Sequence, residues 1–355
     1  MTQGAPPTAT ACHVLVLRFS ALGDVAMSVP VLDAVARSYP HVRFTMVSRP
    51  MCRALFAHMP PNVHFVGVDL KRQYHGLAGL IRLCGGLAEL HPTAVADLHD
   101  VLRTQWLRRW FRLSGCRVAH IRKGRAARRA LTRSRRKQRV QLPTSFERYA
   151  RVFAQLGYGV EHIGFSSVFS HLPGGLPPVP ENCPDKGAEK WVGVAPFAAH
   201  AGKIYPLPLM WEVLRALAAR PGVRLFLFGG GAPEVEQLEK WSRKLPAAVC
   251  VPRALHTLAD ELALMAHIDV MLTMDSANMH LASLAGTRVI SLWGATHPLA
   301  GFMGWRQNPA DALQTDLPCR PCSVFGNKPC ARGDYACLTR ISPSDVAARV
   351  LAALT

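Results

Sequence analysis

The sequence predicts an α/β protein with two doubly wound, Rossmann-like domains that face a central cleft. Strand and helix patterns alternate along the first half, a Pro/Gly-rich stretch at 171–188 interrupts them, and the alternation then starts again. Short apolar runs separated by helices of ordinary length are typical of βαβ units, which build parallel sheets. We therefore expect a first domain over 13–170, a linker over 171–188 and a second domain over 189–342. Residues 1–12 are expected to form a loose tail and residues 343–355 a closing helix.

The elements of the first half follow from its apolar patterns. Short runs rich in Val, Leu and Phe predict strands at 13–17, 43–47, 63–68, 94–97 and 117–121. Longer amphipathic stretches between and after them predict helices at 25–38, 49–58, 77–90, 101–114 and 145–156.

The second half repeats this alternation after the prolines and glycines of the linker, which suit neither helix nor strand. Strands are predicted at 191–195, 223–228, 248–251, 270–274 and 288–292, and helices at 209–219, 234–244, 258–266, 276–284 and 344–353. No short internal repeat is visible, which argues against a solenoid.

The composition is that of a well-packed globular protein. Of the 355 residues 49% are hydrophobic and 18% charged, which argues against disorder. No apolar run reaches the roughly 18 residues of a membrane-spanning helix. The first ten residues carry neither a basic nor an apolar stretch of the secretory kind. We therefore expect a cytoplasmic protein.

The positive charge is concentrated in one segment. The formal net charge is +19, and residues 103–139 hold 15 Lys or Arg and no acidic residue, whereas 27 basic and 23 acidic residues nearly balance elsewhere. A run of this kind is by default a solvated or disordered basic loop, and it would also suit a nucleic-acid backbone. An anionic membrane surface fits better, because each Lys or Arg near one gains about 1 kcal/mol.

Two predicted strand ends carry acidic residues beside a helix start. Asp24 follows the first strand in a turn with Ser20 and Gly23, where it can accept a proton from a hydroxyl or simply cap the helix. Asp275 and Ser276 follow the strand at 270–274 and open a helix that also carries Ala277 and His280. Free N–H groups at such a start attract a diphosphate, although Asp275 could be only a cap and His280 a core histidine.

Two further loops of the second half suit an anionic ligand. Lys203 follows the strand at 191–195 in a loop of small residues, where its ammonium can neutralise a phosphate, or serve as an ordinary surface lysine. Gly229 and Gly230 end the strand at 223–228, where they allow close approach of a ligand or simply a tight turn.

Four of the ten cysteines cluster in a loop at 318–338. Cys319, Cys322, Cys330 and Cys337 lie within 19 residues, and four thiolates can hold one structural zinc. Reduced thiols or a disulfide pair are the alternatives.

The order of these motifs resembles that of the bacterial lipopolysaccharide heptosyltransferases, glycosyltransferase family 9. The match rests on Ser20, Gly23, Asp24 and Pro30, then on Lys203, and then on the 274–286 segment followed by a Gly-strand-Gly pattern. Ala277 and Asn278 stand where the family usually has a glycine. The resemblance implies the GT-B architecture and an inverting, metal-independent transfer of heptose from ADP-heptose to the inner core of lipopolysaccharide.

The resemblance also implies roles for individual residues. Asp24 would be the catalytic base, and the donor would be bound by Lys203, Asp275, Ser276, Ala277, His280, Gly229 and Gly230. The acceptor, an anionic lipid-linked glycan, would lie near Ser20, Gly23, Arg103 and Arg122, with the protein on the cytoplasmic face of the inner membrane. No cofactor beyond a structural zinc, and no nucleic acid, is then expected.

Two other functions stay open at this stage. A related transferase would use another nucleotide sugar or glycan acceptor, and a non-enzymatic nucleic-acid-binding protein would depend on residues 103–139. A dinucleotide-dependent oxidoreductase is disfavoured, because neither half has Gly-x-Gly-x-x-Gly after its first strand.

Overall fold

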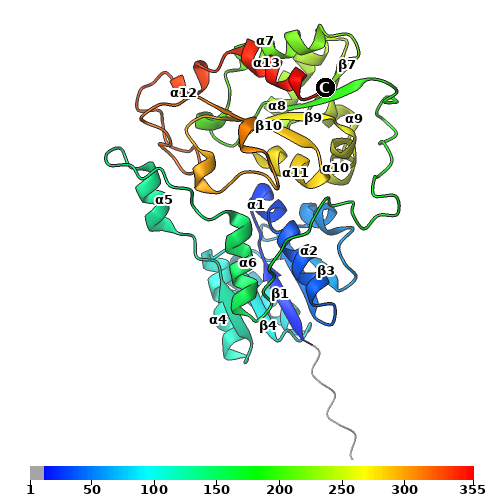
Figure 1. Ribbon diagram of the computed structural model, residues 1–355. Coiled ribbons are helices and arrows are strands. Elements are labelled where there is room, and N and C mark those ends of the chain that lie inside the picture. Colours follow the sequence, from blue (N-terminus) through cyan, green and yellow to red (C-terminus); the bar gives the residue numbers. More distant parts are fainter. Residues whose placement is uncertain (1–11) are drawn as a thin grey trace, which may run out of the picture. The chain divides into compact units, whose positions relative to one another are not determined.

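The computed structural model describes residues 12–355, so most of the expected N-terminal tail lies outside the described residues. The chain divides into two compact units (Figure 1). The first holds residues 12–20, Val31–Arg122 and Tyr149–Gly164, and the second holds Ala21–Pro30, Lys123–Arg148 and Phe165–Thr355. The second unit therefore includes two segments, 21–30 and 123–148, that come from the first half of the sequence.

The first unit is built on a five-stranded parallel sheet in the order β3-β2-β1-β4-β5. Its strands are β1 (His13–Leu17), β2 (Arg43–Ser48), β3 (Val63–Gly67), β4 (Ala94–Asp97) and β5 (Arg117–His120). Its helices are α2 (Val29–Ser38), the short 3-10 helix η1 (Pro50–Phe56), α3 (Gly76–Ala88), α4 (Leu102–Leu113) and α6 (Ser145–Gln155).

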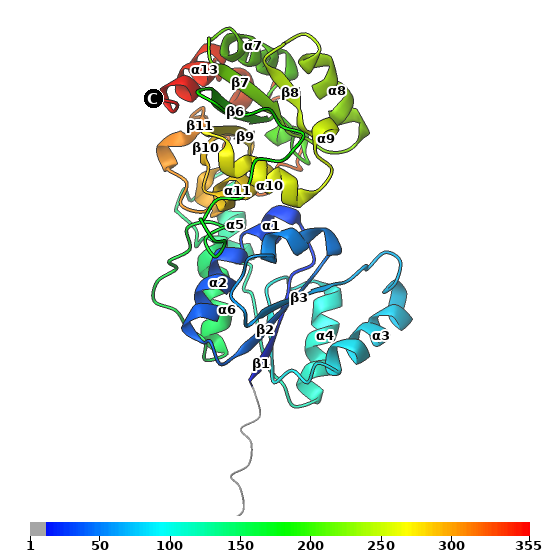
Figure 2. The same ribbon diagram turned by 90° about the vertical axis from the view of Figure 1, so that its right-hand side faces the viewer.

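Helices cover both faces of this sheet, as Figure 2 shows. Helices α3 and α4 lie on one face, where Leu83, Leu107 and Phe111 pack with Leu15 and Leu17 of β1. On the other face Phe153 of α6 meets Phe44 of β2 edge to face. Burial on both faces explains why the central strands β1 and β4 consist mainly of apolar residues.

The second unit has a six-stranded parallel sheet in the order β11-β10-β9-β6-β7-β8. Its strands are β6 (Lys190–Ala195), β7 (Val223–Leu227), β8 (Ala248–Cys250), β9 (Val270–Met274), β10 (Arg288–Trp293) and β11 (Ala312–Gln314). Its helices are α1 (Leu22–Ala26), α5 (Arg125–Thr132), α7 (Leu207–Ala218), α8 (Ala232–Ser242), α9 (Val251–Ala254), α10 (Leu258–His267), α11 (Ala277–Ala285), α12 (Ala336–Thr339) and α13 (Pro343–Ala352), with 3-10 turns η2 (Ala201–Lys203), η3 (Pro298–Ala300) and η4 (Pro309–Asp311).

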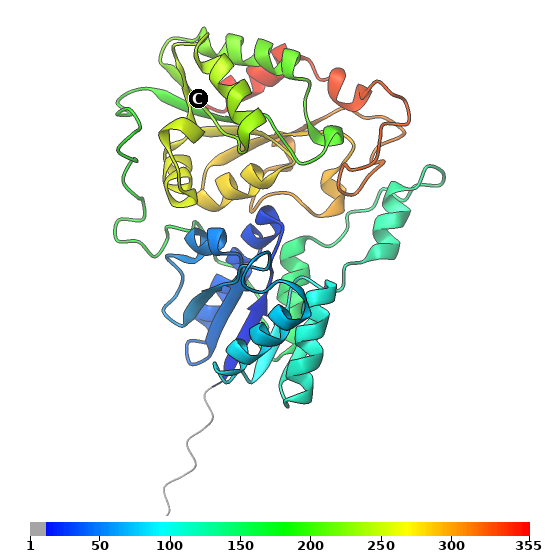
Figure 3. The ribbon, with the colours of Figure 1, turned by 180° about the vertical axis from the view of Figure 1, so that it is seen from behind.

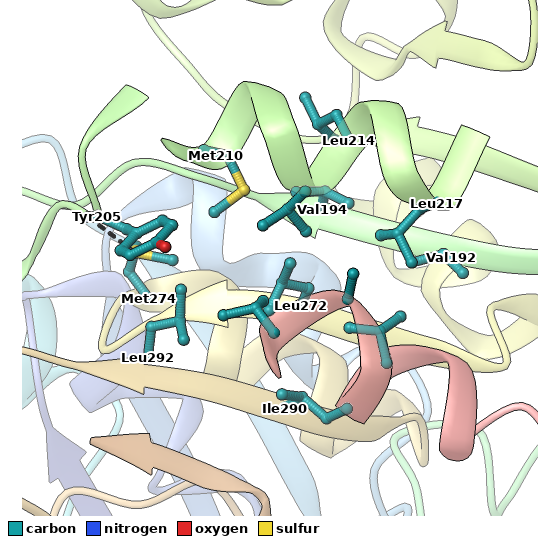
Figure 4. Packing of buried hydrophobic residues seen from close by; sticks show 14 of the residues in the cluster. Val192, Val194, Tyr205, Met210, Leu214, Leu217, Leu272, Met274, Ile290 and Leu292 are labelled. Carbon is teal, nitrogen blue, oxygen red and sulfur yellow. Dashed lines mark hydrogen bonds between the residues drawn. The ribbon is translucent and has the colours of Figure 1, made fainter. Parts of the chain in front are cut away.

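The core of the second unit lies between this sheet and α7 with α13 (Figure 4). Met210, Leu214 and Leu217 of α7 pack on strand residues such as Val194 and Leu272. The Tyr205 N–H points at the Met274 sulfur, 3.3 Å away. This packing fixes the strand ends that carry Lys203 and Asp275.

Three local differences from the predicted elements have physical reasons. The helix predicted over 25–38 is split into α1 and α2, because Pro30 has no N–H and its ring disfavours helix in the preceding turn. The strand β11 and the helices α9 and α12 were not predicted, since three or four residues carry little periodic signal.

The third difference is α5, which forms within the stretch expected to be a solvated or disordered loop. Gly124 precedes it in the left-handed conformation, and Leu131 is fully buried. The Arg128 guanidinium lies 4.9 Å from the ring centre of Phe302 and 5.9 Å from that of Phe325. Cation–π contact and one buried leucine anchor this basic helix to its unit.

No helix within residues 12–355 is long and apolar enough to cross a membrane.

Candidate active site

A cavity of about 530 Å³ opens in the second unit, at the carboxyl ends of β6, β7 and β9. This is the edge at which open parallel sheets bind ligands, and the volume is that of an ordinary small-molecule site. The segment 21–27 completes its wall. The cavity is lined by Ala21, Leu22, Gly23, Asp24, Met27, Phe197, Ala198, Ala199, His200, Lys203, Gly229, Gly230, Glu234, Asp275, Ser276, Ala277, Asn278, His280, Phe302 and Phe325.

A largely buried ion pair belongs to this lining. Lys203 in η2 and Asp275 after β9 meet with Nζ and Oδ2 2.9 Å apart, and their side chains are 16% and 4% exposed. The stem of Lys203 also packs against the backbone of Gly326, where an added Cβ would lie 2.6 Å from Lys203 Cγ. Lys203 is therefore held on two sides with its cation at the cavity.

The helix α11 presents its N-terminus to the same cavity. Ser276 is its N-cap in extended conformation, but its hydroxyl lies 3.2 Å from the Thr273 hydroxyl instead of capping a helix N–H. Ala277 and Asn278, the first two residues of the helix, line the cavity. The partial positive charge of a helix start and the Lys203 ammonium together suit a diphosphate.

Asp24 is the third residue of α1 and lines the cavity as well. Its Oδ2 accepts a hydrogen bond from the Ala21 N–H at 3.3 Å. Asp24 therefore does contribute to capping α1, as one of the two interpretations of the sequence predicted, because Ala21 is the N-cap residue of this helix. A carboxylate of this kind, half-buried in a ligand-sized cavity, can also accept a proton from a bound hydroxyl.

His280 of α11 lines the same cavity and interacts electrostatically with Asp24, Asp275 and Lys203. Burial lowers the pKa of His280 to about 4, although the carboxylates of Asp275 and Asp24 act in the opposite direction. The ring is therefore neutral near pH 7. A Cβ added to Gly23 would lie 2.7 Å from His280 Cδ2, so a glycine is needed where α1 packs on α11.

The glycine turn after β7 forms another wall. Glu234 accepts a hydrogen bond from the Gly230 N–H at 2.8 Å, and a Cβ on Gly229 would lie 3.2 Å from both Glu234 and Phe197. Of the predicted donor-site residues, Lys203, Asp275, Ser276, Ala277, His280, Gly229 and Gly230 all line the cavity.

Sequence reasoning missed the aromatic lining and one acid. Glu234 follows the triple glycine and Phe197 lies two residues after β6, so both stood at strand ends where they could have been found. Phe302 and Phe325 come from loops without any periodic pattern, and no local signal marked them.

Three of the predicted acceptor residues belong to the first unit and do not line this cavity. The Ser20 hydroxyl lies 3.5 Å from His99 Nε2. Arg103 and Arg122 are exposed. Gly23, the fourth, lines the cavity in the second unit.

The four-cysteine loop gives the expected structural zinc no support. All four thiols are free, and among the described residues no three His, Cys, Asp or Glu side chains gather as a metal site. Burial raises the pKa of Cys322 and raises that of Cys337 to about 11. Arg320 holds the loop instead, donating to the carbonyls of Trp293, Gly294 and Thr296.

Residues 87–329 match the model of the family described as "Glycosyltransferase family 9 (heptosyltransferase)". The chain belongs to this family. The resemblance predicted from the sequence motifs is thereby confirmed, and the protein is a glycosyltransferase.

Three known proteins match this chain over most of its length. Lipopolysaccharide heptosyltransferase 1 of Pseudomonas aeruginosa is 25% identical over 96% of this chain and 98% of its own. A family 9 glycosyltransferase structure from Veillonella parvula aligns with TM-score 0.70 at 17% identity, covering 98% of both chains. E. coli heptosyltransferase WaaC with ADP-2-deoxy-2-fluoro heptose aligns with TM-score 0.63 at 17% identity, covering 88% of this chain and 97% of that one. The predicted GT-B class with Rossmann-like domains is confirmed.

Proposed function

We propose that this glycosyltransferase transfers heptose from ADP-heptose to an anionic, lipid-linked acceptor of the lipopolysaccharide inner core. The observation that carries the proposal is that Asp24, Lys203 and Asp275, from three separate parts of the chain, line one cavity of nucleotide-sugar size. The Pseudomonas relative acts on lipopolysaccharide, and the structure of WaaC holds an ADP-heptose analogue.

In the proposed reaction the acceptor hydroxyl oxygen attacks the anomeric carbon of the donor sugar. The bond from that carbon to the diphosphate oxygen breaks, ADP leaves, and the hydroxyl proton passes to the Asp24 carboxylate. Attack from the face opposite the leaving group inverts the anomeric centre, so a single base is sufficient.

We propose that Lys203 and the N-terminus of α11 stabilise the negative charge that develops on the departing diphosphate. Lys203 is already paired with Asp275 at 2.9 Å, so its ammonium is positioned before the donor arrives. A cation fixed in a half-buried site stabilises developing negative charge more than a mobile surface lysine does. Asp275, Ser276, Ala277 and His280 would line the diphosphate and sugar, while Gly229 and Gly230 would admit the nucleoside.

The acceptor is proposed to meet the protein at Ser20, Gly23, Arg103 and Arg122, with the enzyme at the cytoplasmic surface of the inner membrane. The two arginines are exposed cations, and a phosphorylated, lipid-anchored glycan is anionic. This part of the proposal rests on charge complementarity.

Calorimetry and turnover of two variants test the assignment. Lys203→Ala is expected to lose donor affinity by one to two orders of magnitude, since a charge-assisted contact is worth about 1.5–3 kcal/mol. Asp24→Asn is expected to bind ADP-heptose nearly as wild type while losing at least about a hundredfold in transfer rate. Lys190→Ala, an exposed lysine at the far end of β6, is the control.

Normal turnover by Asp24→Asn would show that another group is the base. Tighter binding of a UDP- or GDP-sugar than of ADP-heptose would identify a related transferase with a different donor.

A further inference from the structure

The outward face of α4 in the first unit is unusually apolar for a surface helix. Leu102 is 84% exposed and Leu113 is 90% exposed, while Trp106 and Trp110 are 40% and 38% exposed. Single exposed apolar residues are ordinary, but four large ones on a 12-residue helix mark an interaction surface.

The spacing places these side chains opposite the buried side of the helix. Thr104, Leu107 and Phe111 are buried, and they are spaced three and four residues apart, as one helix face requires. Leu102, Trp106 and Leu113 are separated by four and seven residues, so they share the other face. The two leucines of the exposed strip are therefore not part of the core of this unit, whereas the half-buried Trp106 also contacts the buried Cys84 of α3.

Positive charge borders this strip. Arg103, Arg109 and Arg112 of α4 are exposed, and the helix contains no acidic residue. Its fourth arginine, Arg108, is instead paired with Asp97 and Asp100. The adjacent helix α3, which packs beside α4 in Figures 2 and 3, adds exposed Leu77 and Ile81 and has Arg82 as its charged residue.

We propose that α4, supported by α3, is a membrane-docking surface that inserts its Leu and Trp side chains into an anionic lipid bilayer. Leucine and tryptophan on one face with arginines along the border are the pattern of helices that lie in the plane of a bilayer interface. Indole rings favour that interface, and arginine pairs with lipid phosphates. This inference rests on the proposed function, because a lipid-anchored acceptor is accessible only to an enzyme that binds at the membrane surface.

Three basic residues later in the segment make contacts within the second unit. Lys137 donates to the carbonyls of Cys319 and Pro321, and Arg139 donates to the Leu317 carbonyl. Arg128 stacks on Phe302 and Phe325. Arg103, Arg109 and Arg112 therefore remain available to the docking surface that we propose, whereas Arg128 braces two aromatic residues of the cavity wall.

Vesicle flotation of the full-length protein tests this surface. The vesicles are phosphatidylcholine alone or phosphatidylcholine with about one third phosphatidylglycerol. Wild type is expected to float with the anionic vesicles. Leu102→Ser/Leu113→Ser should lower partitioning by about tenfold or more, because each buried CH₂ contributes to binding. Arg109→Ala/Arg112→Ala should lower it about fivefold per arginine on anionic vesicles only.

The control variants replace the same kinds of side chain as the test variants, but at positions outside α4. Val140→Ser/Leu176→Ser removes exposed apolar side chains elsewhere, and Arg133→Ala/Arg135→Ala removes exposed charges of the second unit. Both controls should float as wild type. Equal loss in either control, or unchanged flotation of the leucine variant, would overturn the proposal. The proposal would also be overturned if wild type did not float and light scattering showed that it forms a dimer which the leucine variant does not form.

Transfer to a delipidated, soluble acceptor separates this inference from the proposed function. The α4 variants should retain wild-type transfer rates there. Absence of transfer by every protein, including wild type, would count against the proposed function, and the flotation result would still decide the role of α4.

Discussion

Gly326 links the four-cysteine loop to the cation of the active site. Its φ is +76°, and a Cβ would lie 2.6 Å from Lys203 Cγ. Gly326→Ala is therefore expected to lower the free energy of unfolding by about 1–2 kcal/mol and also to weaken ADP binding by displacing Lys203. Gly333→Ala is the control, because Gly333 has φ +77° but nothing within 4 Å of the added carbon. Equal ADP affinity of the two variants, measured by calorimetry, would show that Gly326 does not position Lys203.

His280 couples stability to pH. Its pKa in the folded protein is about 4 against 6.5 for a free histidine, because burial disfavours the charged ring. The unfolded chain thus binds a proton that the folded one does not, and stability falls as the pH drops from about 6.5 to 4. The loss attributable to this residue is about 3 kcal/mol. Urea titrations across this range should show a smaller loss for His280→Gln, whereas exposed His256→Gln should follow wild type.

At the scale of elements, the contact between α1 and α11 determines where Asp24 stands. Gly23→Ala would place a carbon 2.7 Å from His280 Cδ2 and push α1 away from α11. We expect transfer to slow by at least about tenfold with ADP affinity changed much less, since the displaced group is the proposed base. Gly85→Ala in α3 meets nothing within 4 Å and should keep full activity while gaining up to about 1 kcal/mol of stability. A wild-type rate for Gly23→Ala would mean that α1 does not position the base.

The elements that the sequence predicted well are those with repeated patterns. The central strands β1, β6 and β9 are apolar runs that are buried almost throughout. Asp24, Lys203 and Asp275 follow the carboxyl ends of these three strands, which is why these residues could be named in advance. The residues that complete the cavity wall could not be predicted from the sequence. Phe302 and Phe325 come from irregular loops, and α5 is held by the burial of Leu131 and by the contact of Arg128 with two aromatic rings far away in the sequence. Tertiary contacts of this kind leave no periodic trace in the chain.

On the scale of the whole molecule, the division into units does not follow the chain order. Residues 21–30 and 123–148 belong to the second unit although both lie in the first half of the sequence. The composition shift at 171–188 marks where the second alternation of strands and helices begins, but it carries no information on which earlier segments pack with it. The basic run is divided in the same way, with Arg103–Arg122 in one unit and Lys123–Arg139 in the other.

This division predicts how nucleotide binding spreads through the protein. Every residue that lines the cavity belongs to the second unit, so ADP should stabilise that unit, by about 2.7 kcal/mol at one hundred times the dissociation constant. Hydrogen exchange with ADP is expected to slow in the 21–27 segment together with η2 and the first turn of α11. The β2 and β3 strands of the first unit should exchange as in the free protein. Protection that spares 21–27 but covers η2 and α11 would indicate that ADP binds without engaging the α1 wall, and would remove the reason to place Asp24 beside the donor.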